Sequence, residues 1–95
     1  MGYDEVFNEL QAGKAASGLP CGDVRRLLTQ VGFTVRDGSK GGHKIVTHDH
    51  LDGFTTAAYN CKGGDGIVGR AYLGKLIQVL KTYKTGIKEY LGEDE

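Results

Sequence analysis

The sequence predicts an α+β fold in which helices cover one face of a three-stranded antiparallel sheet. Apolar residues recur at helical spacing towards both ends of the chain, while the middle holds three short runs of β-branched and aromatic residues separated by glycine-containing turns. Helices that flank a run of antiparallel strands usually pack together on one face of the sheet. We therefore expect the other face to be open to solvent or to a ligand.

Length and composition set the limits of this fold. With 95 residues, 39% of them hydrophobic and 25% charged, the chain can form one small domain but not two independently stable ones. We predict a single domain over residues 1–95, with an N-terminal helical extension at 1–18 and a core at 21–91. An acidic N-terminus and the lack of an apolar run near the roughly 20 residues that span a bilayer predict a soluble, cytoplasmic protein without a membrane partner. In that compartment Cys21 and Cys61 are expected to be free thiols.

Two helices are expected ahead of the strands. The first covers Tyr3 to Ala16 and has acidic residues in its first turn, where they suit the positive end of the helix dipole. After a break at Ser17 to Pro20, Gly22 or Asp23 can cap a second helix that stops at Gly32. The apolar residues that share one face of this second helix are Val24, Leu27, Leu28 and Val31.

Three strands and one long helix account for the rest of the chain. Phe33 to Arg36 and Lys44 to His48 are β-rich runs on either side of a glycine-rich turn, which predicts a hairpin. Phe54 to Tyr59 is the third strand candidate. From Arg70 onward the spacing is that of an amphipathic helix, with Gly86 as the expected point of interruption. Its apolar positions are Leu73, Leu76, Ile77, Leu80, Tyr83, Ile87 and Leu91.

The charges are unevenly distributed, although the formal net charge is zero. Between Val24 and Lys88 there are eleven Lys and Arg residues against four acids, a net charge of +7, and the other acids crowd into the ends of the chain. At ionic strengths where the Debye length is roughly 8–10 Å, the local field matters more than the net charge. A basic centre of this kind favours a phosphate-bearing partner.

All three histidines lie between Gly38 and His50, and His43 is the one with a chemical context. It stands at the mouth of a predicted strand, after two glycines and close to cationic side chains. An imidazole with the ordinary pKa of about 6.5 can act as general base or general acid at neutral pH, and nearby cations can stabilise phosphate charge. This set of groups suits RNA cleavage without a metal, in which the 2′-OH attacks the adjacent phosphate. From the residues alone, a surface histidine without a role is the simpler interpretation.

His48 and His50 could instead belong to a metal site. On a strand the two would point to one face, with Asp49 and Asp52 nearby as oxygen ligands. Strict alternation places His43 on the opposite face, so a third ligand would have to come from elsewhere. We therefore favour a solvated turn for His48 and His50 and predict no metal and no cofactor.

Several segments of the chain carry a resemblance to a known family. In order, they read DVRRLLTQVGF, GGHKIVTH, FTTAAYNC and AYLGKLIQVL. Over Cys21 to Tyr90 the chain resembles the HicA (YcfA-like) family of toxin-antitoxin mRNA interferases. The family's helix ending in leucine, glycine and an aromatic residue is matched by Leu28, Gly32 and Phe33. The resemblance implies a double-stranded-RNA-binding-domain-like fold of one helix, three antiparallel strands and another helix.

The same resemblance implies an activity and its residues. The family's catalytic histidine falls on His43, which would be the base or acid in metal-independent cleavage of mRNA. Gly42 stands where the family commonly has serine. The residues expected to contact RNA phosphates, by position and charge, are Arg36, Lys40, Lys44 and Lys62. The implied protein partner is a HicB-type antitoxin that covers the active-site surface. A non-catalytic RNA-binding module on the same fold is the alternative.

Overall fold

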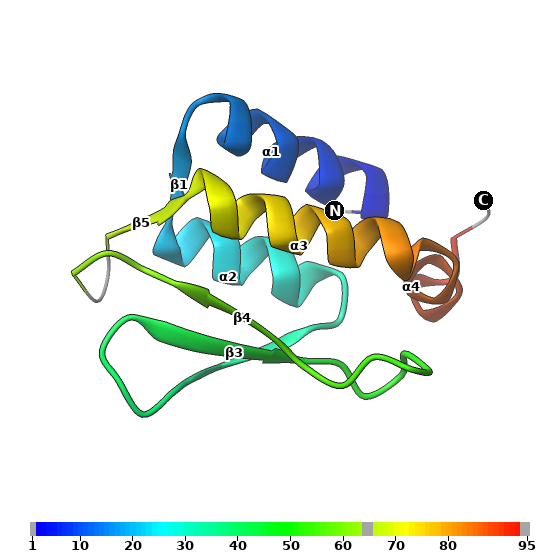
Figure 1. The fold of residues 1–95 in the computed structure, drawn as a ribbon. Helices are drawn as coiled ribbons and strands as arrows, with labels where there is room; N and C mark the ends of the chain where they lie inside the picture. The colour runs from blue at the N-terminus through cyan, green and yellow to red at the C-terminus, as the bar shows by residue number, and fades with distance from the viewer. Residues whose placement is uncertain (1, 64–65, 94–95) are drawn as a thin grey trace.

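Helices lie on one side of a three-stranded antiparallel sheet, which confirms the predicted α+β class (Figure 1). The computed structural model describes residues 2–63 and 66–93. Its elements are α1 (Tyr3–Ala15), β1 (Gly18–Pro20), α2 (Cys21–Gln30), β2 (Thr34–Asp37), β3 (His43–Thr47), β4 (Ala57–Asn60), β5 (Ile67–Gly69), α3 (Arg70–Thr82) and α4 (Lys84–Leu91). None of the helices in these two ranges is long and apolar enough to cross a membrane.

The sheet has the order β2-β3-β4, with β3 in the centre. The predicted hairpin is present, since Thr34 of β2 pairs with Thr47 of β3 across the glycine-rich turn. On the other side β3 pairs with β4 from Val46 opposite Ala57 down to His43 opposite Asn60. The third strand starts later than predicted, at Ala57 rather than Phe54, because β3 ends at Thr47 and leaves the preceding residues without a pairing partner.

Side chains alternate along β3 between the core and the open face. Lys44 and Val46 are buried beneath the helices, whereas His43, Ile45 and Thr47 are only half-buried. The prediction that one face of the sheet stays accessible is therefore met along the strand that begins with His43.

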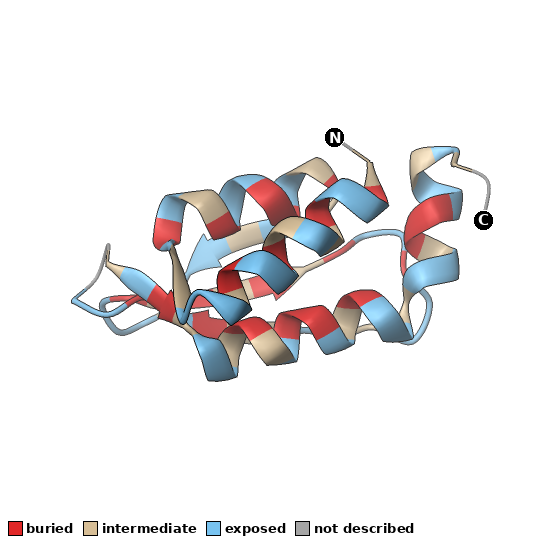
Figure 2. Cartoon of the chain, turned by 90° about the horizontal axis from the view of Figure 1, so that it is seen from above, coloured by how far each residue is buried: buried red, intermediate tan, exposed pale blue. Residues whose placement is uncertain are grey.

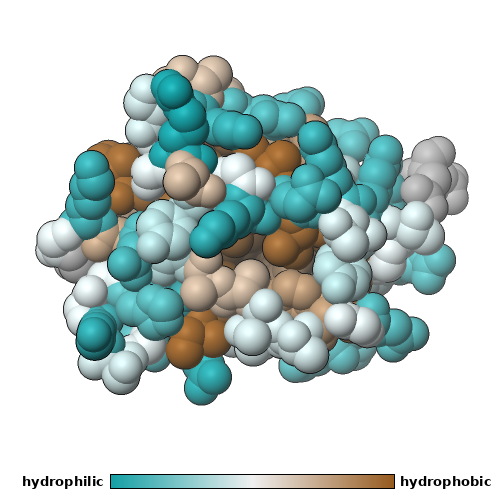
Figure 3. Space-filling model, viewed as in Figure 1, coloured by the Kyte–Doolittle hydropathy of each residue, from teal (hydrophilic) through white to brown (hydrophobic). Residues whose placement is uncertain are grey.

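The core lies between the sheet and the helices, and Figure 2 shows its contributions as buried stripes along the helices. The helix predicted as an N-terminal extension supplies part of it, because Tyr3, Val6 and Leu10 are buried. The Tyr3 hydroxyl also donates a 2.7 Å hydrogen bond to the carbonyl of Leu80, which ties α1 to α3. Figure 3 shows the molecule from the same side as Figure 1. Hydrophilic side chains dominate this side, and apolar residues show mainly between the helical layer and the sheet.

A second, two-stranded sheet was not predicted. β1 pairs antiparallel with β5, with Gly18 opposite Gly69 and Pro20 opposite Ile67, so the segment expected to be a break is a strand. The pair lies at one end of the helical layer, where β1 leads into α2 and β5 leads into α3 (Figure 1). Because α2 follows β1 directly, it begins at Cys21, ahead of the predicted caps. Three-residue strands are too short to show a periodicity in sequence.

The C-terminal helix is divided at Tyr83 rather than at Gly86. Tyr83 leaves helical geometry at ψ 22°, and its hydroxyl donates a 3.1 Å hydrogen bond to the carbonyl of Gly53. Gly86 lies inside α4, where a Cβ would come within 3.0 Å of a methyl group of Leu51. The glycine thus allows close packing of α4 and does not interrupt it.

Cys21 and Cys61 form a disulfide, so the prediction of free thiols is wrong. Cys21 is the first residue of α2 and Cys61 directly follows β4, and the fold brings their Cα atoms to 5.6 Å. The two residues are 40 positions apart, and their spacing gives no sign of this proximity. Only the packing of α2 on the sheet brings them together.

Reduction of the Cys21–Cys61 disulfide is expected to lower the free energy of unfolding by about 4 kcal/mol, because the bond closes a loop of 40 residues and restricts the unfolded chain. Urea unfolding with and without a reductant measures the difference. The double variant Cys21→Ser, Cys61→Ser is the control and should not respond to the reductant. An unchanged midpoint in wild-type protein whose thiols titrate as reduced would contradict the expectation.

Candidate functional site

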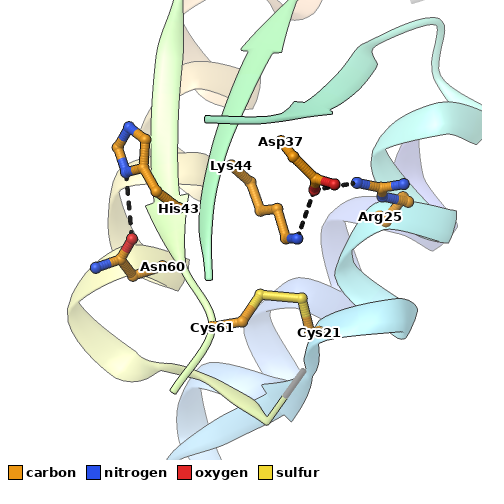
Figure 4. Close-up of polar contacts among 7 residues, drawn as sticks. All are labelled: Cys21, Arg25, Asp37, His43, Lys44, Asn60 and Cys61. Carbon is orange, nitrogen blue, oxygen red and sulfur yellow. Dashed lines mark hydrogen bonds and ion pairs between the residues drawn. A yellow bond between two sulfur atoms is a disulfide. The ribbon is translucent and has the colours of Figure 1, made fainter. Parts of the chain in front are cut away.

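His43, the first residue of β3, projects from the open face of the sheet. Its Nδ1 lies 3.2 Å from Oδ1 of Asn60, the residue directly opposite on β4 (Figure 4). The backbone of His43 is held as well, since its N–H donates to the carbonyl of Lys40 and its carbonyl accepts from the N–H of Gly38. Both the strand position and the ring of His43 are therefore fixed by neighbours.

Gly38 forms the other wall of the His43 ring. A Cβ added at Gly38 would overlap Cδ2 of the imidazole, so a residue with a side chain would force the ring to move. The ring thus lies between Gly38 on the hairpin turn and Asn60 on β4. In Figure 4 its second nitrogen, Nε2, lies on the side of the ring away from Asn60.

The turn that precedes His43 requires glycine at position 42. Gly42 has φ +81°, in the left-handed region that residues with a Cβ rarely adopt. Its carbonyl also accepts a 2.8 Å hydrogen bond from the N–H of Cys61, which joins the turn to the end of β4. A serine at position 42 would therefore be strained in this turn.

His43 lines adjoining concavities of the surface. One, of about 660 Å³, extends along the open face of the sheet. Its other lining residues are Arg36, Ile45, Thr47, Thr55, Thr56, Ala57 and Ala58. The second, of about 370 Å³, lies over the hairpin turn and is lined by Ser39, Lys40, Gly41 and Asn60 together with His43. A chain that lay across this face would pass the imidazole from one concavity to the other.

Three of the four predicted RNA-contacting cations are exposed on the parts of the chain around His43. Arg36 on β2 borders the larger concavity and Lys40 borders the smaller one. Lys62 is exposed two residues beyond Asn60. Arg36 and Lys40 thus place positive charge along the concavities that His43 lines.

Lys44, the fourth of these cations, lies on the opposite face of the sheet from His43 (Figure 4). Its side chain is 11% exposed, and its ammonium lies 2.6 Å from the carboxylate of Asp37, which also accepts a 3.2 Å hydrogen bond from Arg25. The hydrogen bond from Lys44 and its charge hold the pKa of the Asp37 carboxyl below its usual value. The structure therefore does not place Lys44 beside His43, and its charge is already paired.

His48 is buried, so the prediction of a solvated turn is wrong for this residue. Only 7% of it is exposed, and its ring packs edge-on against Phe33 and Tyr90. Its Nε2 donates to the carbonyl of Val31 at 3.2 Å, and its Nδ1 accepts the N–H of His50 at 3.1 Å. Both ring nitrogens are thus satisfied in the neutral form. His50 itself is exposed, as predicted, and stacks on the ring of Tyr90.

The metal reading of His48 and His50 gains no support from this geometry. Within residues 2–63 and 66–93, no three His, Cys, Asp or Glu side chains are grouped closely enough to hold a metal ion. Both nitrogens of His48 are occupied by backbone groups. A ligand role for His48 would require one of these two hydrogen bonds to break.

Asn60 and Gly38 are the site residues that sequence reasoning missed. The third strand was expected to end at Tyr59, which left Asn60 outside the sheet. Residues two apart on a strand share a face, so extension of that strand by one position would have placed Asn60 on the same side as Ala58. Gly38 was assigned to the turn, and nothing in the sequence indicates that it contacts the ring of His43.

Comparison of the chain with models of protein families, with curated proteins and with solved structures gave no significant match. The resemblance to the HicA family therefore stays a prediction.

The free energy of unfolding is expected to fall as the pH drops below about 6.5, because burial lowers the pKa of His48 in the folded chain. In the pH range between that lowered pKa and about 6.5, the unfolded state binds more protons than the folded state, so acid favours unfolding. Above this range the contribution of neutral His48 to the free energy of unfolding is fully present. Urea unfolding between about pH 7.5 and about pH 5.5 measures the loss.

Two histidine variants separate this effect from other titrations. The variant His48→Gln should lose most of the pH dependence, while His50→Gln, which alters an exposed histidine, should keep it. The same pH dependence in wild-type and His48→Gln protein would show that another group is responsible.

Proposed function

We propose that the protein is an endoribonuclease of the HicA kind, which cleaves mRNA with His43 as its catalytic acid or base. The observation that carries the proposal is the position of His43 where surface concavities adjoin, with Arg36 and Lys40 among their lining residues. Nε2 of His43 makes no hydrogen bond to any described residue and lies on the side of the ring away from Asn60. A titratable nitrogen is thus available next to positive charge on an accessible surface.

The chemistry needs a proton acceptor and stabilisation of phosphate charge. As the 2′-OH of the substrate loses its proton, the 2′ oxygen forms a bond to phosphorus, the bond from phosphorus to the 5′ oxygen breaks, and that oxygen gains a proton. The products are a 2′,3′-cyclic phosphate and a 5′-OH end. His43 supplies proton transfer, and Arg36 and Lys40 are placed to stabilise the developing negative charge.

The order of the central elements supports a double-stranded-RNA-binding-domain-like fold. α2, β2, β3, β4 and α3 follow the helix, three antiparallel strands and helix expected of HicA proteins. In this proposal α1, the β1–β5 pair and α4 are additions to that unit. The additions pack on the helical side or at its end and leave the face with His43 uncovered (Figure 1).

We further propose that a HicB-type antitoxin covers this same face. An inhibitor that contacts Arg36 and Lys40 would use acidic groups, because complementary charge both attracts a partner and selects it. Covering the two concavities would block access of RNA to His43. The RNA substrate and the inhibitor would then compete for one surface.

Replacement of His43 by alanine is expected to lower the rate of RNA cleavage by roughly 10²- to 10⁴-fold, the usual contribution of a general acid or base. Cleavage of a labelled RNA by purified protein measures it, with analysis of the ends for a cyclic phosphate. His50→Ala is the matched control, since it removes an exposed histidine that lies beyond the far end of β3.

Equal cleavage by wild type and His43→Ala would overturn the catalytic assignment. Wild-type protein that binds RNA with a strong salt dependence but never cleaves it would instead be the non-catalytic RNA-binding module.

Replacement of Arg36 or Lys40 by alanine is expected to weaken RNA binding and to lower the slope of log affinity against log salt by about one for each phosphate that is no longer neutralised. Binding is measured with His43→Ala as the background, so that the RNA stays intact. Lys81→Ala removes an exposed cation from α3, in the helical layer, and should leave both quantities unchanged. Equally weakened binding in all three variants would indicate a diffuse positive field rather than a surface centred on His43.

A further inference from the structure

We propose that Asn60 is a positioning residue that fixes the tautomer of His43 and so makes it the general base of the reaction. This inference rests on the proposed function and deepens it, because the pattern around His43 alone left base and acid open. It follows from one contact, the 3.2 Å approach of Nδ1 of His43 to Oδ1 of Asn60.

The position of Asn60 is set by the backbone on both sides. It is the last residue of β4 and stands directly opposite His43 in the antiparallel register. The next residue, Cys61, donates its N–H to the carbonyl of Gly42 and is joined by its disulfide to Cys21. The strand end that carries the Asn60 amide is therefore tied to the turn before His43 and to the start of α2 (Figure 4).

The direction of this contact decides which nitrogen of His43 carries the proton. A carboxamide oxygen can only accept a hydrogen bond, so an Oδ1 that faces Nδ1 requires an N–H there. A neutral imidazole has a single N–H, and Nε2 is left with a lone pair. With the opposite amide orientation, the NH₂ group would donate to Nδ1, and Nε2 would carry the only N–H of the neutral ring and could not accept a proton.

The contacts of the ring hold Nε2 on the side away from Asn60, where the proposed RNA substrate would lie. Gly38 stands against the Cδ2 edge and Asn60 holds the Nδ1 edge, so the ring cannot turn without breaking one of these contacts. When Nε2 takes the proton of the 2′-OH, the imidazolium keeps its Nδ1–H bond to the amide oxygen. Asn60 thus orients the base before the proton transfer and retains its contact after it.

The test compares Asn60→Ala with Asn60→Asp. Alanine removes the acceptor, and we expect kcat for RNA cleavage to fall roughly 10- to 100-fold with little change in KM. Aspartate keeps an acceptor that cannot donate, so much of kcat should return. Its charge favours the imidazolium, so the acidic limb of the pH-rate profile should move about one pH unit or more towards higher pH. Asn8→Ala, on the exposed side of α1, is the matched control.

A readout that needs no cleavage separates this inference from the proposed function. Nitrogen NMR of the free protein at a pH where His43 is neutral should show the Nδ1–H tautomer in wild type and in Asn60→Asp, and its loss in Asn60→Ala. The Nε2–H tautomer in wild type, or an unchanged kcat in Asn60→Ala, would overturn the inference. If the tautomer follows Asn60 while wild-type protein leaves RNA intact, the proposed function fails, and the catalytic role of Asn60 fails with it.

Discussion

The pleat of β3 is the constraint on which the rest of the structure depends. Because successive side chains point to opposite faces, a single strand delivers Lys44 and Val46 to the core side and His43 to the open side. A shift of one residue in the register would exchange the two sets and bury the candidate catalytic imidazole. The pairing of β3 with both neighbouring strands prevents such a shift, and it also brings Asn60 opposite His43.

The basic centre of the chain is less uniform in space than in sequence. Lys44 is paired with Asp37, and Lys88, also buried, lies 3.6 Å from the carboxylate of Asp4. The guanidinium of Arg70 is directed to Ser17 and to a backbone carbonyl. Folding therefore engages several cations in local contacts. The net charge of +7 therefore overstates the number of cations that are available to a polyanion. Those that remain exposed around His43 are available.

Structural features that are marked by a repeating sequence pattern could be predicted, whereas those that depend on a single contact between distant residues could not. The hairpin and the helix faces were predictable because several residues in each follow one period. The position of Asn60 opposite His43 depends on the strand register, which the sequence pattern does not indicate. The buried position of His48 involves a hydrogen bond to the carbonyl of Val31, 17 residues away. The Cys21–Cys61 pairing likewise follows from the packing of α2 on the sheet.

The disulfide also determines how the candidate site is connected covalently. The ring that it closes runs from residue 21 to residue 61 and contains Arg36, Lys40, His43 and Asn60. The tip of the hairpin at Ser39 to Gly41 is an exposed part of this ring. A protease that cut the chain there would open the ring without separating its halves, so the strands on either side of the cut would stay joined until the sulfur bridge was reduced.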